Sequence, residues 1–467
     1  MADQEAFDVV SEGLAEVHRQ LLPLDSGEVA SYIPTLALAD PDDFGLALVS
    51  MDGHRYQAGS AGVRFSIQSV SKPFVYALAL AELGLDEVSR WVGNEPSGDS
   101  FNAISLERGT GRPANAMINA GAIATTSLVP AATTVERFER ILHTLSAFAG
   151  RTLDVDEDVY HSEAASGDRN RALAYLMHAA GSLRSDPAEA AEVYFRQCSL
   201  RVDTVDLAVM AATLAAGGVN PVTGRRVVSE QVAIQVLSVM ATCGMYDAAG
   251  DWLVRVGLPA KSGVSGGLAA ASPARFGIAC YSPPLDHTGS PVRAVAALRE
   301  LSERFGLHLM HRPAPGGATV TVCSTADQDR SGRERTAAHR ALLTREGSRI
   351  ALVAAQGELD FLAAERLMVA LGDVVPTVPG WVVVDLTEVT TVRLPAGGML
   401  AGVLGRIAAL GHHIALVGLS AGSAQPDDPL AVEALSAGIA RHATRASALG
   451  WAEDALLTEL TDSPAPG

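Results

Sequence analysis

The chain has 467 residues, of which 48% are hydrophobic and 19% are charged, so it can bury sizeable cores and is not expected to be disordered. Lysine and arginine number 35 against 53 aspartate and glutamate residues, which gives a net charge of −18. Such a charge repels nucleic-acid phosphates and anionic lipid surfaces, so neither nucleic acid nor a membrane is expected as a partner.

No export or membrane signal is visible in the sequence. The first ten residues lack the basic stretch followed by an apolar one that a secretory signal has. No uninterrupted apolar run approaches the ~20 residues of a membrane span. The four cysteines are dispersed, with neither a CxxC pair nor the histidine spacing of a zinc site. We therefore expect a cytoplasmic protein with reduced thiols, and we expect neither a metal nor another cofactor.

The first motif in chain order is Ser-x-x-Lys, formed by Ser69 and Lys72. Because Pro73 is tolerated only in the first turn of a helix, the apolar run Phe74–Leu80 predicts a helix that begins near Ser69. Lys72 lies one turn further on and can take the hydroxyl proton, and the start of a helix favours negative charge. Taken alone, the motif also fits a capping serine followed by a solvated lysine.

A second motif is the tripeptide Lys-Ser-Gly at residues 261–263, inside the glycine-rich segment 257–267. In serine acyl-transfer enzymes that use Ser-x-x-Lys, a tripeptide of this type on a strand edge forms the opposite wall of the site. Taken alone, it also fits a glycine-rich turn between two strands. The presence of both motifs, in this order, favours a serine acyl-transfer site.

The C-terminal part of the chain has the pattern of a separate domain. The polar stretch Ser324–Arg340 has no apolar stripe and predicts a linker or a solvated helix. After it, short β-branched runs alternate with helical spacing, which predicts a small α/β fold with a mostly parallel sheet. The predicted strands are Arg349–Ala355, Trp381–Leu386 and His412–Leu419, and the predicted helices are Phe361–Val374, Gly397–Leu410 and Leu430–Ala448.

Nine short segments in the first part of the chain together carry a family resemblance. They are Tyr32–Leu36, Gln68–Pro73, Glu95–Gly98 with Phe101 and Asn102, Met117–Ala122, Ser162–Asn170, Tyr194–Ser199, Thr242–Asp247, Pro259–Gly267 and Gly277–Leu285. In these segments the chain resembles the bacterial and mitochondrial-type glutaminases, which are serine-dependent hydrolases. The resemblance implies a multidomain chain of the α/β and α+β classes. Its first domain would have a β-lactamase/penicillin-binding-protein-like fold, with a mixed sheet plus a helical subdomain.

Carried over position by position, the resemblance implies roles for individual residues. Ser69 would be the nucleophile and Lys72 its activating partner, while Tyr32 and Tyr246 would line the reacting amide and move protons. The implied substrate-binding residues are Ser69, Asn119, Glu163, Asn170, Tyr194, Tyr246 and Val264. The backbone N–H groups of Ser69 and Val264 would form an oxyanion hole.

These residue types suit L-glutamine, because Glu163 can bind its ammonium group while asparagine and tyrosine side chains bind its carboxylate. If the stretch from Glu163 to Asn170 is one helix, both side chains lie on the same face. The implied reaction is attack of Ser69 on the side-chain amide, release of ammonia and hydrolysis of the glutamyl-enzyme to L-glutamate. Either Lys72 or a tyrosine can be the general base. A neutral Lys72 requires a pKa lowered by burial or by nearby positive charge, for which Lys261 is a candidate.

Segments Gly357–Phe361 and Val382–Leu386, with the helix that follows, resemble the STAS domain, a module of anti-sigma-factor antagonists. Regulatory members carry an Asp-Ser pair at the start of that helix, and its serine is phosphorylated. Because this chain has Arg393 and Leu394 there, we do not expect a phosphorylation switch through this residue. A structural or oligomerisation role and regulation by a bound small molecule or protein both stay open, and the partner of this module is unknown.

The resemblances divide the chain into a glutaminase domain at 1–312, a linker at 313–346, a STAS-like domain at 347–458 and a tail at 459–467. They imply a homo-oligomer, either a dimer or a tetramer, that acts on L-glutamine. Two alternatives stay open. One is a β-lactam-recognising serine acylase on the same fold, and the other is a regulatory STAS protein whose first domain only senses glutamine.

Overall fold

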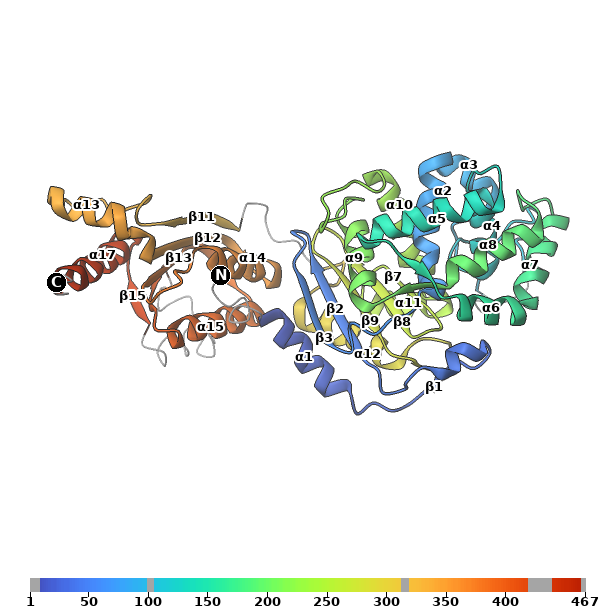
Figure 1. Ribbon diagram of the computed structural model, residues 1–467, viewed down its shortest axis with the longest axis horizontal. Coiled ribbons are helices and arrows are strands. Elements are labelled where there is room, and N and C mark those ends of the chain that lie inside the picture. The colour runs from blue at the N-terminus through green and yellow to red at the C-terminus, as the bar shows by residue number, and fades with distance from the viewer. Residues whose placement is uncertain (1–8, 99–104, 312–318, 419–438, 463–467) are drawn as a thin grey trace. The chain divides into compact units, whose positions relative to one another are not determined.

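The computed structural model describes residues 9–98, 105–311, 319–418 and 439–462 (Figure 1). The chain forms two compact units. The first unit comprises residues 11–311, and the second comprises residues 312–467 together with residues 1–10. The predicted multidomain organisation is therefore confirmed. Of the segments that carry the family resemblance, Phe101 and Asn102 lie outside the described residues.

The first unit is built on a five-stranded sheet with the strand order β3-β2-β9-β8-β7. All neighbouring strands are antiparallel, so the predicted mixed sheet is wrong. Short turns join β2 to β3, β7 to β8 and β8 to β9, and such turns make neighbouring strands run in opposite directions. The strands are β2 (Gly45–Ser50), β3 (Arg55–Gly59), β7 (Ala260–Ser262), β8 (Gly267–Ser272) and β9 (Phe276–Tyr281).

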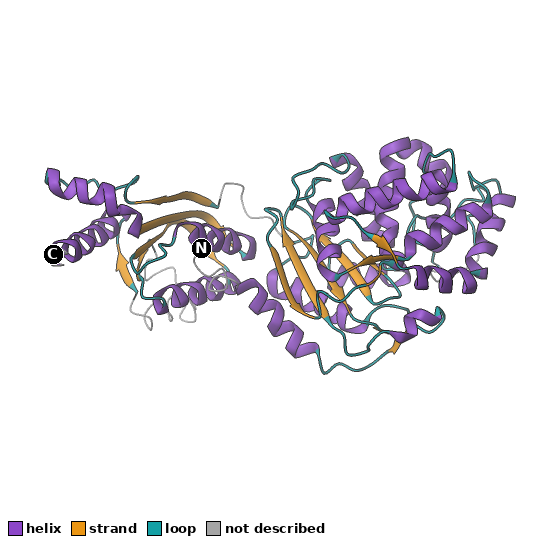
Figure 2. Cartoon of the chain, viewed as in Figure 1, coloured by secondary structure: helices purple, strands orange, loops and turns teal. Residues whose placement is uncertain are grey.

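Helix α9 (Thr204–Ala215) packs against β2, β8 and β9 of this sheet (Figure 2). Asp203 caps the helix by accepting a hydrogen bond from the backbone N–H of Asp206, at 2.8 Å. Gly277 in β9 allows the helix to approach closely, since a β-carbon there would lie 2.1 Å from the backbone nitrogen of Ala212. The backbones of α9 and β9 are therefore in close contact. This contact fixes the helix against the sheet, whose edge strand is β7.

The rest of the first unit is mainly helical, around helix α2 (Lys72–Leu83). This helix packs against α4, α5 and α10, and its residues 72–80 are all buried. The predicted helix over Phe74–Leu80 is thus confirmed, and the burial explains why it is apolar on all sides.

The remaining elements of the first unit complete this helical layer and two small sheets. The helices are α1 (Val9–Leu21), η2 (Pro34–Leu38), η3 (Gln68–Ser71), α3 (Leu85–Trp91), α4 (Asn119–Leu128), α5 (Thr134–Ala149), α6 (Glu157–Ser166), α7 (Asp168–Ala179), α8 (Pro187–Cys198), α10 (Glu230–Cys243), η4 (Tyr246–Ala248), α11 (Ala249–Arg255) and α12 (Val292–Phe305). The short strands are β1 (Glu28–Val29), β4 (Phe65–Ser66), β5 (Asp154–Val155), β6 (Leu200–Val202) and β10 (Pro284–Leu285), paired as β1-β10 and β4-β6-β5.

Across the described ranges, no single helix has the length and apolar character needed to cross a membrane. Helix α10 and the segment Tyr246–Arg255 pass this test only as a pair, and the two are bent by 90°.

The second unit has a five-stranded sheet with the order β11-β12-β13-β14-β15. Strands β12 to β15 are parallel and β11 is antiparallel, which confirms the predicted mostly parallel sheet. The predicted helix Phe361–Val374 has the bounds of α14, where Asp360 caps the N-terminus by accepting a hydrogen bond from Ala363 N–H. The other elements are β11 (Val320–Thr325), α13 (Ala337–Glu346), η5 (Gly347–Arg349), β12 (Ile350–Leu359), β13 (Trp381–Val392), α15 (Leu394–Ala409), β14 (His413–Val417), β15 (Ala440–His442) and α17 (Arg445–Asp462).

The structure differs from the predicted linker at 313–346. In the described part of this segment, β11 pairs with β12 and α13 packs against α17. Strand β11 lies at the edge of the sheet, and none of its residues is fully buried. Its sequence therefore lacks the apolar run by which a buried strand can be predicted. The helix expected at 430–448 also differs. Residues 419–438 lie outside the described residues, and β15 and the start of α17 occupy the rest. Helix α17 continues to Asp462, into the predicted tail.

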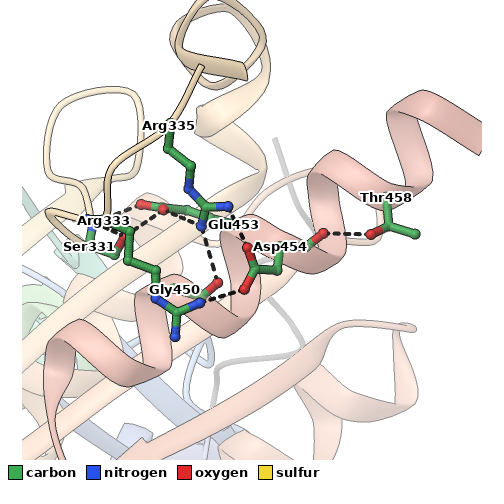
Figure 3. Close-up of polar contacts among 7 residues, drawn as sticks. All are labelled: Ser331, Arg333, Arg335, Gly450, Glu453, Asp454 and Thr458. Atoms are coloured by element: carbon green, nitrogen blue, oxygen red, sulfur yellow. Dashed lines mark hydrogen bonds and ion pairs between the residues drawn. The ribbon is translucent and has the colours of Figure 1, made fainter. Parts of the chain in front are cut away.

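An ion-pair network fixes the segment before α13 on helix α17 (Figure 3). The buried Glu453 accepts hydrogen bonds from Ser331 N–H at 2.7 Å, from Ser331 Oγ at 2.6 Å and from Arg335 at 3.0 Å. Arg335 is also nearly buried and pairs with Asp454. Arg333, whose side chain is half exposed, reaches Asp454 from outside at 2.5 Å. The buried pair thus holds a charged segment that has little apolar surface of its own.

Arg335→Ala is expected to lower the free energy of unfolding of the second unit by about 3 kcal/mol, because the buried Glu453 carboxylate loses its cation. The matched control, Arg333→Ala, removes the exposed ion pair with Asp454, which lies beside Glu453 on α17. It should lower the free energy of unfolding by at most about 1 kcal/mol. Urea unfolding followed by circular dichroism measures both. Equal losses in the two variants would contradict a special contribution from the buried pair.

Candidate active site

Ser69 lies in η3, the single turn of 3-10 helix between β4 and α2. Pro73 occupies the first turn of α2, as the sequence predicts. Gln68 has a left-handed backbone with φ +47°, which is unusual for a residue other than glycine. Ser71 Oγ donates to the carbonyl oxygen of Gln68 at 2.7 Å, and Ile67 N–H donates to the Leu200 carbonyl at 2.8 Å. These bonds hold the turn that presents Ser69.

The Ser69 hydroxyl and the Lys72 amine are in direct contact. Lys72 Nζ lies 2.7 Å from Ser69 Oγ and 2.8 Å from Asn119 Oδ1. The lysine is fully buried, and burial lowers its pKa to about 8, although the charge of Glu163 acts to raise it. An amine with such a pKa can be neutral near physiological pH and can exchange a proton with the hydroxyl beside it.

Asn119 joins several of the predicted substrate-binding residues in one polar chain. Its Nδ2 donates to Asn170 Oδ1 at 3.0 Å, and the hydroxyl of Tyr194 lies 3.4 Å from its Oδ1. Tyr194 is buried, and desolvation raises its pKa well above the usual value. The phenol therefore stays protonated and serves as a neutral hydrogen-bond donor.

Glu163 is buried at the end of α6, where Gln68 Nε2 donates to its Oε2 at 3.1 Å. Burial raises its pKa to about 7, while the hydrogen bond from Gln68 and the charge of Lys72 act to lower it. A carboxylate with so little hydration attracts a cation strongly. Glu163 is therefore the one group of the predicted set that can supply a negative charge.

Glu163 and Asn170 do not lie on one helix, so the condition for a shared helix face is not met. Helix α6 ends at Ser166 and α7 begins at Asp168, with Gly167 between them. A β-carbon at Gly167 would lie 2.4 Å from Phe195 Cζ, so the chain crosses α8 where only glycine fits. Glu163 reaches Gln68 from one helix, and Asn170 reaches Asn119 from the other.

Tyr246 lies in η4 with a left-handed backbone, φ +54°. Its phenol shares a hydrogen bond with Ser69, and desolvation raises its pKa. The Nζ atom of the buried Lys261 lies 3.8 Å from the centroid of its ring. Tyr32 has 57% of its surface exposed, yet desolvation of its phenolic oxygen and the charges of Glu163 and Tyr246 raise its pKa. Two phenols are therefore coupled to the same group of side chains.

Lys261, the candidate for a positive charge near Lys72, is electrostatically coupled to it. The pKa of Lys72 is lowered by its own burial. The pKa of Lys261 falls well below its usual value, first because of burial and then because of the charge of Lys72. Because an interaction between two charges is mutual, each amine disfavours the protonated form of the other, and burial is the main cause of the lowered pKa of both.

The turn after β7 packs against the turn that carries Ser69. A β-carbon at Gly263 would lie 3.1 Å from Val70 Cγ2 and 3.2 Å from the Ile67 carbonyl oxygen. The next residue, Val264, is buried, and none of the described residues accepts a hydrogen bond from its backbone N–H. This segment therefore offers a backbone donor close to the turn that carries Ser69.

Sequence reasoning missed a buried polar chain behind Ser69. Thr126 Oγ1 donates to Gln197 Oε1 at 2.9 Å, and Gln197 Nε2 donates to Ser71 Oγ at 3.2 Å. Ser71 in turn holds the carbonyl of Gln68. Gln68 and Gln197 both lie in segments that carry the family resemblance, but nothing in the local pattern indicates that the two are connected.

A cavity of about 530 Å³ lies beside this cluster, and Tyr246 forms part of its wall. Its other lining residues include Asn115, Thr242, Asp247 and Leu253. Within the described parts of the chain, no three His, Cys, Asp or Glu side chains are grouped as metal ligands.

The chain is similar to known proteins over both units. The family model described as glutaminase matches residues 27–310. Glutaminase 1 of Bradyrhizobium diazoefficiens is 43% identical over 394 residues, which are 84% of this chain and 64% of that relative. This chain therefore spans just under two thirds of the length of that relative.

Solved structures are similar as well. A crystal structure of the protein called Mglu matches with a TM-score of 0.65 and 42% sequence identity. The match covers 87% of this chain and 97% of the Mglu chain. A probable glutaminase from Bacillus subtilis complexed with 6-diazo-5-oxo-L-norleucine has a TM-score of 0.60 and 31% identity, covering 64% of this chain and 97% of that one.

Proposed function

This chain is an enzyme of the glutaminase family, and we propose that it hydrolyses the side-chain amide of L-glutamine to L-glutamate and ammonia. The observation that carries the proposal is the 2.7 Å contact between Ser69 Oγ and Nζ of the buried Lys72. The solved relative bound to 6-diazo-5-oxo-L-norleucine, a diazo-ketone with the amino-acid end of glutamine, supports the choice of substrate.

In the proposed first step, Ser69 Oγ attacks the amide carbon of the glutamine side chain, and its proton passes to the neutral amine of Lys72. The pKa of about 8 supports this role for Lys72. The backbone N–H groups of Ser69 and Val264 would stabilise the oxyanion, each by a few kcal/mol. Collapse of the intermediate breaks the C–N bond, and the nitrogen takes up a proton as ammonia leaves. Water then hydrolyses the glutamyl ester and restores the hydroxyl.

We propose that Glu163 binds the α-ammonium group of the substrate, while Asn119, Asn170 and Tyr194 donate hydrogen bonds around its carboxylate. The burial of Glu163 supports this, because a poorly hydrated carboxylate gains most from a cation. The other three side chains are uncharged and already connected to one another.

Tyr246 and Tyr32 are proposed to move or hold protons at the reacting amide. The hydrogen bond between Tyr246 and Ser69 supports a direct part for Tyr246. Tyr32 is coupled to Glu163 and is partly exposed, which supports a place at the entrance to the site.

For the second unit we propose a STAS-like module in a cytoplasmic homo-oligomer, a dimer or a tetramer. Its parallel strands β12 to β15 support the module. Helix α15 begins at Leu394 with Arg393 as its N-cap, so a phosphorylatable hydroxyl is lacking at that place. This argues for a role other than a phosphorylation switch.

Ser69→Ala is expected to reduce ammonia release from L-glutamine by roughly 10⁴-fold or more, because the nucleophile is lost. Ser238→Ala, at an exposed position of α10, is the matched control and should leave ammonia release nearly unchanged. Wild-type enzyme treated with 6-diazo-5-oxo-L-norleucine should carry the label on Ser69, as read by peptide mass spectrometry. A label elsewhere, or full activity in Ser69→Ala, would contradict the proposed nucleophile.

The ratio kcat/KM is expected to rise with pH through about 7 to 8, because Glu163 must lose its proton and Lys72 must be neutral. Glu163→Gln should raise KM roughly 50-fold with a smaller loss of kcat, and it should abolish the titration near pH 7. Initial rates between pH 6 and 9 measure both effects. Glu157→Gln, on the exposed side of α6, is the matched control. An unchanged KM in Glu163→Gln would rule out the ammonium contact.

A chain that ends at His311 should keep ammonia release within about tenfold of the full chain, since every proposed site residue lies in the first unit. The same shortened chain with Ser69→Ala is the control. A soluble but inactive fragment would show that the second unit contributes to the site.

A further inference from the structure

Tyr246 is held in a strained position. It occupies the break between α10 and α11, two helices at 90°, and its φ of +54° is left-handed. For a residue with a bulky side chain such a backbone costs about 1–3 kcal/mol, so surrounding contacts must maintain it.

One side of Tyr246 offers little support. The cavity of about 530 Å³ has Tyr246 in its wall, together with Thr242, Asp247 and Leu253 from the same helix–turn–helix segment. A side chain that faces empty space has few packing contacts there to fix it. Other contacts must therefore fix the ring, among them the hydrogen bond of its phenol with Ser69 and the amine of Lys72, whose Nζ lies 5.9 Å from the ring centroid.

The buried Lys261 of β7 supplies such a contact. Its Nζ lies 3.8 Å from the centroid of the Tyr246 ring, and it donates to the Ser262 carbonyl at 2.8 Å. An amine below an aromatic face is attracted to it, both as a cation and as a neutral N–H donor.

The support below Lys261 is rigid. Gly244, at the end of α10, lies so close to β7 that a β-carbon there would be 1.8 Å from the Ala260 carbonyl oxygen. Strand β7 also pairs with β8, residue by residue from Ala260 to Ser262. The amine is therefore fixed relative to the turn that carries Tyr246.

We propose that Lys261 is a positioning residue that holds the phenol of Tyr246 beside Ser69 by contact with the face of its ring. Because its amine lies under the ring centroid, Lys261 acts on the ring and does not accept the phenolic proton. The inference rests on the proposed function in one respect, namely that Tyr246 takes part in the reaction at Ser69.

A double-mutant cycle between Lys261→Met and Tyr246→Phe tests the proposal. Methionine matches the length of the lysine stem without the amine. We expect Tyr246→Phe to lower kcat roughly 10²-fold and Lys261→Met to lower it roughly 10- to 100-fold, with little change in KM. In the Tyr246→Phe background, Lys261→Met should change kcat by no more than about twofold, since no phenol remains to be positioned. Additive losses would overturn the proposal.

A crystal structure of Lys261→Met provides a second readout that does not depend on the reaction. The ring should leave Ser69 and move toward the cavity, and an unmoved ring would overturn the proposal. If Lys261→Met does not fold, as judged by circular dichroism, Lys261→Gln serves in both experiments, because its shorter side chain withdraws the nitrogen from the ring. Absence of ammonia release by the wild type would instead count against the proposed function, and the ring position would still decide the role of Lys261.

Discussion

The burial of the Lys72 amine against the Ser69 hydroxyl is the constraint on which the rest of the site depends. A lysine is costly to remove from water, and this cost is what brings its pKa to about 8. The burial requires the apolar surface of α2 and its neighbours α4, α5 and α10 around it. The amine also needs polar partners, which Ser69 and Asn119 supply. The packing of the helices that bury Lys72 therefore also determines the proposed reactivity of the Ser69 hydroxyl.

The turn that carries Ser69 is supported from several directions that are distant in sequence. Thr126, Gln197 and Ser71 form a buried chain behind it, and Gln68 links it to Glu163 in front. Gly263 lets the β7–β8 turn reach it from the sheet. Because these supports converge on one short turn, the proposed nucleophile and the proposed substrate-binding groups are fixed relative to each other before any ligand is bound, which favours catalysis.

Local patterns predicted the parts of this structure that local forces determine. Pro73 was enough to place the start of α2, and regular apolar spacing gave the bounds of α14. The same reasoning failed where long-range packing decides. Helix α6 ends before Gly167 because Phe195 crosses there, and β11 has no apolar run because it is an edge strand. The contact of Lys261 with Tyr246 joins two elements that no local pattern connects.

The buried carboxyl of Glu163 has a consequence for the heat of ligand binding. With a pKa of about 7, about half of the free molecules carry a proton on this group at neutral pH. A ligand whose ammonium group pairs with the ionised form must expel that proton into the solvent. The apparent binding enthalpy measured by calorimetry would then depend on the ionisation enthalpy of the buffer. The slope of the first quantity against the second would give the number of protons released per molecule bound.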